Sequence, residues 1–437
     1  MNESQNQLSH CELVGCGSNE HFNRRTLLKV AGFSGISWLT PVAHQLARAE
    51  EQNRRKRPRS LIILWLEGAA SQLETFDPHP GTEIAAGSKA RNTSVNTIQL
   101  GEGLEQTAEL MEHFAIVRSV VSREGDHERA IYNVKTGYRP DPTLVHPAIG
   151  SVVCHHFRQK DQGVVDIPRH VSVLAASAPA RGGFLGNEYD AFKIGDPLRP
   201  IPDVRAPVDD QRFQRRVGDL RKLNALSSRQ FNAPHLDAAL NMMSSEQLKA
   251  FDISSVAASE RNAYGDAPFG RGCLAAVQLI EAGVRCVEVT LPGWDSHANN
   301  HQIQAERISV LDPAMAALIR DLQRRDLLDQ TIVVCAGEFG RTPFMNIASG
   351  RDHWPHGFSI ALAGGGIQGG RVIGETNPHP KRDSADRLQD IKNPQPIENV
   401  HASILHALGI DHEQEFSTPI GRPMPICEGD VIPELFA

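Results

Sequence analysis

The sequence predicts an α/β fold in which helices cover both faces of a mostly parallel sheet. Short apolar runs, such as residues 61–66 and 331–336, alternate with longer amphipathic segments, such as residues 303–325. Unbroken runs of apolar and β-branched residues suit strands that are buried on both faces, as the strands of a parallel sheet are. Their alternation with helices favours crossover connections between parallel strands.

The remaining elements follow the same rhythm along the chain. Residues from about 180 to 265 are less periodic and rich in proline, and we interpret them as an insertion or lid-like region. Elsewhere the pattern predicts a short helix and a strand within 108–121, helices over 128–135 and from 146, a strand at 170–176, a helix at 272–283, a strand at 285–291, the helix at 303–325, strands at 331–337 and 358–363, and a last helix at 399–410.

Residues 1–49 are typical of an export signal. The segment NRRTLLK at 23–29 is similar to the twin-arginine consensus, a weakly apolar stretch follows it, and residues 47–49 fit an A-x-A cleavage site. The alternative is a membrane anchor, but the stretch is short and is interrupted by Pro41 and His44. We expect export by the twin-arginine machinery and a periplasmic or extracellular product without a transmembrane anchor. Residues 50–60 then form a basic linker.

Charge and cysteine usage narrow the class of protein. The formal net charge of the 437 residues is −7, and it becomes −8 when residues 1–49 are removed, which argues against nucleic acid as a partner. Five cysteines remain in the mature chain without CxxC spacing, so neither a zinc knuckle nor a full disulfide framework is indicated. Cys286 and Cys335 fall in predicted strands, where we expect buried hydrophobic side chains.

Acidic and histidine side chains gather where predicted strands end. In open α/β sheets the ligand lies outside the carboxyl ends of the strands. Carboxylates mixed with imidazoles favour zinc, manganese or iron over calcium, and one or two such ions would clamp a phosphoryl or sulfuryl centre. The candidate residues are Glu67, Asp126, His127, Asp295, His297, His301, Glu338, Asp352, His353 and His356.

Each candidate also has a purely structural interpretation. Glu67 and Glu338 can be buried partners of arginines, and Arg341 is close enough in sequence to hold Glu338. Asp295 and His297 alternate onto one side if the backbone is extended, but they can also form an Asx-turn with a surface histidine. Residues 364–369 match GxGxxG formally, yet they join two strands, which indicates a glycine-rich turn and not a dinucleotide site.

Several motifs together resemble the DUF1501 family of the alkaline phosphatase-like superfamily. They are GAASQLETFDPHPG at 68–81, DHERAIYNVKTG at 126–137, GWDSH at 293–297, GEFGRTP at 337–343, GRDHWP at 350–355 and AGGGIQGG at 363–370. The resemblance extends from residue 61 to 437 and implies an alkaline phosphatase-like three-layer sandwich. Carried over to this chain, it implies one cation at Glu67 and Glu338, and another at Asp295, His297 and His353 or His356.

The chain departs from this superfamily at the nucleophile. By the resemblance, His127 stands where a sulfatase has its modified cysteine or a phosphatase its serine or threonine, and no Cys-x-Pro/Ala-x-Arg motif is present. His127, with Asp126, would then be a nucleophile, a base or a substrate contact, or His127 a further metal ligand; an activated water is the other attacking group. Glu338-Phe339 also replaces an Asp-His pair, which removes one ligand of the second cation.

The sequence therefore predicts an exported, metal-dependent hydrolase of phosphate or sulfate esters, including esters carried on a polysaccharide. The alternative is a catalytically degenerate family member that acts as a secreted binding protein. The departure at His127 favours the binding protein, whereas the acid and histidine cluster favours the hydrolase.

Overall fold

The computed structural model describes residues 59–158, 165–175, 177–178, 180–226, 233–382 and 387–436. The predicted signal at 1–49 and nearly all of the basic linker at 50–60 lie outside these residues. Within the described part of the chain, none of the helices combines the length and the apolar character needed to cross a membrane.

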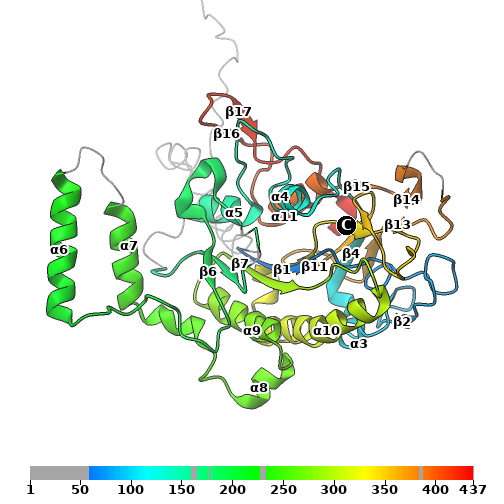
Figure 1. The fold of residues 1–437 in the computed structure, drawn as a ribbon, viewed down its shortest axis with the longest axis horizontal. Coiled ribbons are helices and arrows are strands. Elements are labelled where there is room, and N and C mark those ends of the chain that lie inside the picture. The colour runs from blue at the N-terminus through cyan, green and yellow to red at the C-terminus, as the bar shows by residue number, and fades with distance from the viewer. Residues whose placement is uncertain are drawn as a thin grey trace, which may run out of the picture. The chain divides into compact units, whose positions relative to one another are not determined.

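A nine-stranded sheet forms the centre of the described residues (Figure 1). Its strands lie in the order β12-β4-β11-β8-β1-β7-β5-β6, and β15 pairs with β4. In this sheet β11 is antiparallel to its neighbours, and the other pairings are parallel. The strands are β1 (Ser60–Glu67), β4 (Phe114–Val121), β5 (His170–Val173), β6 (Phe192–Ile194), β7 (Cys286–Pro292), β8 (Thr331–Ala336), β11 (Phe358–Gly364), β12 (Arg371–Ile373) and β15 (Gln395–Pro396).

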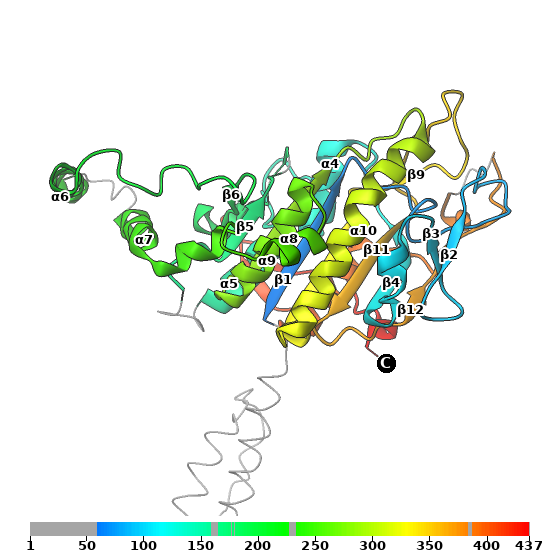
Figure 2. The same cartoon turned by 90° about the horizontal axis from the view of Figure 1, so that it is seen from below.

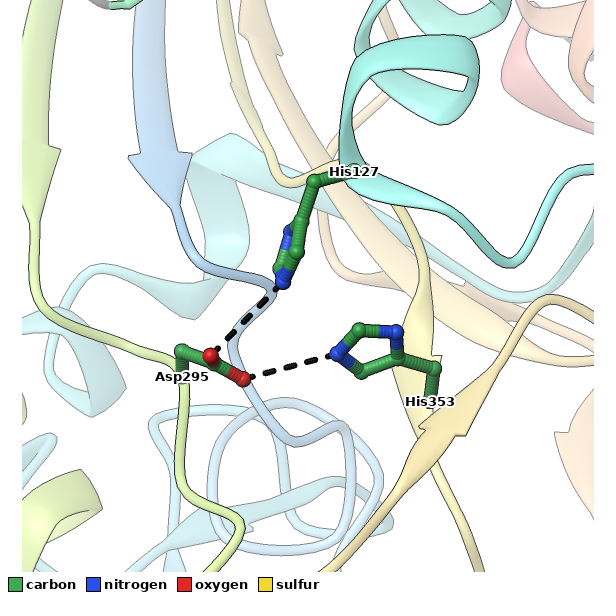
Figure 3. Close-up of side chains that lie close together, drawn as sticks. All are labelled: His127, Asp295 and His353. Carbon is green, nitrogen blue, oxygen red and sulfur yellow. Dashed lines mark ion pairs between the residues drawn. The ribbon is translucent and has the colours of Figure 1, made fainter.

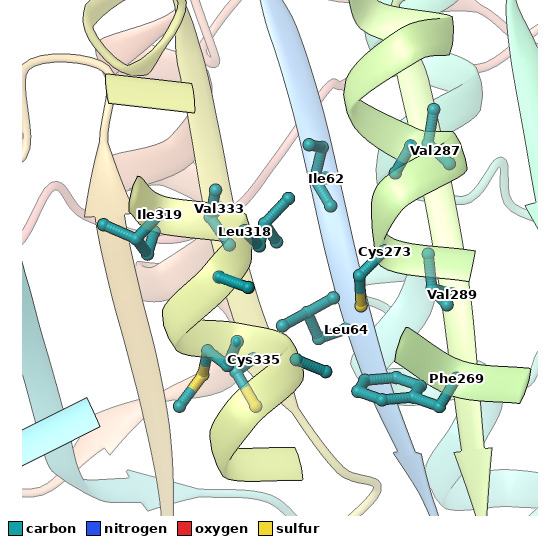
Figure 4. Close-up of a cluster of buried hydrophobic side chains, with 14 of the residues drawn as sticks. Ile62, Leu64, Phe269, Cys273, Val287, Val289, Leu318, Ile319, Val333 and Cys335 are labelled. Atoms are coloured by element: carbon teal, nitrogen blue, oxygen red, sulfur yellow. The ribbon is translucent and has the colours of Figure 1, made fainter. Parts of the chain in front are cut away.

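Helices cover both faces of this sheet, which confirms the predicted layers (Figures 1 and 2). The helices α9 (Pro268–Glu281) and α10 (Asn300–Arg324) lie on one face. The helices α4 (His127–Thr136), α5 (Ile149–Arg158) and α11 (Ile397–Ala407) lie on the other. Side chains of a strand alternate between faces, so Ile62 and Leu64 of β1 pack with α9 and α10, as Figure 4 shows, whereas Leu61 and Trp65 pack with α4, α5 and α11.

The other elements surround this core. The region at 180–265 contributes β6 to the sheet edge and contains α6 (Asp210–Leu226), α7 (Ala233–Ser244) and α8 (Ala258–Ala263). The short helix α3 is Glu105–Ala108. Four two-stranded pairs complete the described elements: β2 (Ala90–Asn92) with β3 (Gln99–Gly101), β9 (Gly340–Arg341) with β10 (His353–Trp354), β13 (Glu375–Thr376) with β14 (Ile391–Lys392), and β16 (Glu415–Ser417) with β17 (Pro423–Pro425).

The local predictions hold with shifted boundaries. Helix α4 begins at His127 because the Asp126 side chain accepts a hydrogen bond from Arg129 N, and it ends at Gly137 in the left-handed conformation. The strand predicted at 170–176 ends at Val173, since Leu174 has a φ of 55° that breaks the extended backbone. Cys286 and Cys335 are buried in strands as predicted.

His401 joins two of the helices that cover the same face of the sheet. Its Nε2 lies 2.8 Å from Val134 O, so α11 donates a hydrogen bond to the last turn of α4. Burial lowers the pKa of His401 to about 4, because the charged imidazole would lose its hydration there. The neutral ring is therefore part of the packing between α4 and α11.

We predict that this histidine makes stability depend on pH. The unfolded chain binds a proton near the ordinary pKa of 6.5, whereas the folded ring binds it only near 4. The free energy of unfolding therefore falls as the pH drops from 6.5 to 4, and this group contributes about 3 kcal/mol to that fall. Urea unfolding at several pH values should show a flatter profile for His401→Asn. His406→Asn, on the exposed side of the same helix, is the control, and an unchanged profile for His401→Asn would contradict the assignment.

Candidate metal centre

The chain brings acidic and histidine side chains together beyond the carboxyl ends of three adjacent strands. Strands β7, β1 and β8 are parallel neighbours, so the loops that follow them lie at one edge of the sheet. Asp295 comes from the loop after β7, His353 from β10 and His127 from the first position of α4. Their ligand atoms all lie within 4.8 Å of one another, and Figure 3 shows both rings directed toward Asp295.

Asp295 and His353 also form a triangle with His297, and its size is the one that the ligands of a tetrahedral zinc require. Asp295 Oδ1 lies 3.3 Å from His297 Nε2 and 3.5 Å from His353 Nε2. The two imidazole nitrogens are 2.9 Å apart. Ligands about 2.0 to 2.1 Å from a tetrahedral zinc are separated from one another by roughly 3.3 Å. The triangle therefore fits one divalent cation.

The hydrogen bonds of the two histidines fix their tautomers. His297 Nδ1 lies 2.8 Å from Asp352 Oδ1, and His353 Nδ1 lies 2.8 Å from Gly125 O. A carbonyl oxygen and an ionised carboxylate only accept, so each Nδ1 carries a proton. Both Nε2 atoms then direct lone pairs at the same point, where they repel unless a proton or a cation lies between them. Metal-binding histidines are oriented in this way by their second nitrogen.

His127 faces the same point and is held by Glu338. Its Nδ1 is 3.0 Å from Glu338 Oε1, and its Nε2 is 3.7 Å from Asp295 Oδ2. Glu338 is fully buried at the end of β8, and its Oε1 also accepts a hydrogen bond from Gly68 N at 2.8 Å. The hydrogen bond to Glu338 raises the pKa of His127 against the opposing effect of burial. Nδ1 therefore donates to Glu338, and in the neutral ring the Nε2 lone pair lies toward Asp295 and the triangle.

The turn after β1 needs a glycine at this place. Gly68 has a φ of 102°, and a Cβ atom there would lie 2.6 Å from Asp295 N. Its amide reaches Glu338 while its carbonyl accepts a hydrogen bond from Arg341. Any larger residue would push the Asp295 loop away from both histidines.

The aromatic side chain of Phe339 packs against two histidine rings of the centre. The Phe339 ring is 1% exposed, and its centroid lies 5.1 Å from that of His127 and 4.4 Å from that of His353. Burial, together with the nearby Arg341 charge, lowers the pKa of His353. Its neutral form, the one that binds a metal, is therefore favoured.

Arg341 pairs with Asp295, and not with Glu338 as one interpretation of the sequence suggests. Its Nη2 donates to Asp295 Oδ1 at 2.6 Å and also to Gly68 O. Burial raises the pKa of Asp295, but the hydrogen bond and charge of Arg341 outweigh it, so the pKa stays below its usual range. Asp295 is therefore ionised.

Three other candidates from the sequence contact residues outside the triangle. Glu67 was expected at a cation with Glu338, but its carboxylate accepts hydrogen bonds from Ser177 N at 2.9 Å and Ser177 Oγ at 2.7 Å. Asp126 caps α4, and the His356 ring packs edge-on against Trp354. Glu67 lies two residues after Trp65 on β1, so it shares the face of Trp65 and lies on the opposite side of the strand from Leu66.

Comparisons with known proteins place the chain in a family whose activity is not described. No curated protein sequence matches it.

Solved structures resemble it only at low identity. PsFucS1 sulfatase from Pseudoalteromonas sp. is 11% identical, with a TM-score of 0.36 over 84% of this chain and 70% of that one. The lipoteichoic acid synthase LtaP from Listeria monocytogenes is 11% identical, with a TM-score of 0.35 over 82% and 73%. A TAB5 alkaline phosphatase mutant with Mg bound is 12% identical, with a TM-score of 0.35 over 81% and 99%.

The family model described as "Protein of unknown function (DUF1501)" matches residues 58–436, and the chain belongs to this family.

Proposed function

We propose that this DUF1501 protein is an exported hydrolase of phosphate or sulfate esters that uses one divalent cation. The observation that carries the proposal is the triangle of Asp295, His297 and His353, in which both histidine tautomers leave Nε2 free for a ligand bond. Two imidazoles and one carboxylate favour zinc, manganese or iron over calcium. Glu67 lies on Ser177, which supports one cation over two.

The residues around the triangle have distinct roles in this proposal. A cation bound there would polarise the ester oxygens and lower the pKa of a water molecule. His127 is the group that faces the ester, because Glu338 holds the proton on Nδ1 and leaves the Nε2 lone pair toward the centre. That lone pair can take a proton from a water that attacks the phosphorus or sulfur and displaces the alcohol, and the imidazolium then gives the proton to the departing alkoxide. Alternatively, the lone pair attacks the ester itself and displaces the alcohol, and water then hydrolyses the phospho- or sulfo-imidazole. Glu338 stabilises the imidazolium that forms in the first case.

The exposure of the ligands favours ester groups that project from a large molecule. The side chains of Asp295, His297 and Asp352 are 45%, 46% and 55% exposed. Such a centre is reached from solvent without passing through a narrow pocket, so a sulfated or phosphorylated polysaccharide can present its ester groups to it. Export, which the twin-arginine motif predicts, would bring the enzyme to such polymers.

A second candidate is a metal-free binding protein. Arg341 already gives Asp295 Oδ1 a cationic partner at 2.6 Å, so the carboxylate is compensated without a metal ion. The two proposals are separated by metal content.

We predict near-stoichiometric zinc, manganese or iron in mature protein purified without chelators or an affinity metal. Asp295→Asn and His353→Gln should lose this metal, because each removes a donor of the triangle. Glu67→Gln is the matched control: it also removes a strand-end charge, but its partner is Ser177, so metal content should be unchanged. Elemental analysis decides the matter. Folded wild-type protein without metal, or equal loss in Glu67→Gln, would refute the proposed centre.

We further predict that His127→Asn lowers kcat for an activated aryl phosphate or sulfate by about 10²- to 10⁴-fold while the metal content stays the same. Glu338→Gln should lower it less, because the amide can keep Nε2 directed at the centre but cannot stabilise the imidazolium. His406→Asn is the control for a remote histidine. Denaturation at alkaline pH during turnover should trap a phosphorylated or sulfated imidazole only if His127 is the nucleophile. Full activity of His127→Asn would exclude both roles.

A further inference from the structure

We infer that Arg341 is the positioning residue of this centre, which holds Asp295 so that one of its oxygens faces the two histidines. The inference rests on the proposed function. Arg341 itself does not contact the substrate in this assignment, because its side chain is fully buried. It acts through the residues that do.

The guanidinium is fixed by backbone carbonyls before it reaches Asp295. Nε donates to Ala69 O at 3.1 Å, Nη1 donates to Arg351 O at 3.1 Å, and Nη2 donates to Gly68 O. These carbonyls belong to the turn after β1 and to the segment before β10. A planar group bound at three places cannot rotate, so the remaining direction of Nη2, toward Asp295 Oδ1 at 2.6 Å, is fixed as well.

The backbone of Arg341 is held equally firmly. The Gln72 side chain accepts a hydrogen bond from Arg341 N at 2.9 Å and donates one to Arg341 O at 2.8 Å. Arg341 also pairs with His353 in the register of β9 and β10. One residue therefore sets the position of two ligands, Asp295 through its side chain and His353 through its backbone.

The bond to Arg341 leaves Asp295 able to bind a cation. A carboxylate oxygen has two lone-pair directions, and the guanidinium uses one of them on Oδ1. The other is available on the side of the histidines, where Oδ1 lies 3.3 Å from His297 Nε2. The charge-assisted bond thus orders the carboxylate without occupying the place of the metal.

The test is the zinc affinity of Arg341→Lys, measured by competition with a chromophoric chelator on the mature chain. Lysine keeps the positive charge but has one nitrogen, which cannot reach all the acceptors of the fork. We expect the Kd for zinc to rise about 10- to 100-fold. Arg118→Lys is the matched control, because its guanidinium lies 3.5 Å from the buried Asp77 and donates to Gln99 O, and neither residue is a proposed ligand. Its Kd should equal that of the wild type.

A double-mutant cycle separates positioning from general damage. If Arg341 acts through Asp295, Arg341→Lys should add almost nothing to the loss of zinc affinity in an Asp295→Asn background. If Arg341→Lys does not fold, Gln72→Met replaces it. That variant removes the two bonds that hold the Arg341 backbone, and it should weaken zinc binding in the same direction by a smaller factor.

Two outcomes overturn the inference in distinguishable ways. A folded Arg341→Lys protein that binds zinc as tightly as the wild type, or a loss that is fully additive with Asp295→Asn, rejects the positioning role alone. Folded wild-type protein that does not bind zinc, manganese or iron rejects the proposed metal centre and the role of Arg341 with it.

Discussion

A buried guanidinium needs an acceptor for its N–H groups, and this requirement organises the candidate metal centre. Removing the Arg341 charge from water is costly unless carbonyls and a carboxylate surround it. The acceptors come from the turn after β1, the loop after β7 and the segment before β10, which are distant in sequence. These three segments therefore come together whenever Arg341 is buried. The ligand geometry is a consequence of satisfying this one cation.

A second buried guanidinium, that of Arg351, connects further parts of these loops. Arg351 contacts Glu74 Oε1 at 3.0 Å and donates to the carbonyls of Thr342, Pro343 and Ile84. His301 Nδ1 lies 3.2 Å from Glu74, and its Nε2 lies 3.0 Å from Ala86 O. Burial raises the pKa of Glu74, but the contacts with His301 and Arg351 outweigh it and lower the pKa to about 2. The ionised carboxylate therefore links the loop after β1 to the start of α10 and to the segment that carries His353.

The sequence predicts the parts of this arrangement that depend on local periodicity. Alternation along β1 and the placement of acids at strand ends follow from the chain itself, and the Asp295-x-His297 spacing places both side chains on one side. The sequence does not predict the partner of a charged side chain, because the two partners are far apart in the chain. Arg341 bonds Gly68 across 273 positions and Glu67 bonds Ser177 across 110. No pattern in a single sequence indicates which carboxylate each arginine or serine receives, so the sequence leaves open both Arg341 with Glu338 and Glu67 with a cation.

Phe339 limits the number of ligand groups on one side of the candidate centre. Its buried ring packs against Ala69 and Ala130 and touches the rings of both His127 and His353. An aromatic ring has no lone pair to give a cation. A second cation ligand is therefore missing where Phe339 lies, while the two imidazoles are held against a rigid surface. The Nε2 atoms of His297 and His353 both face Asp295, whose side chain is 45% exposed.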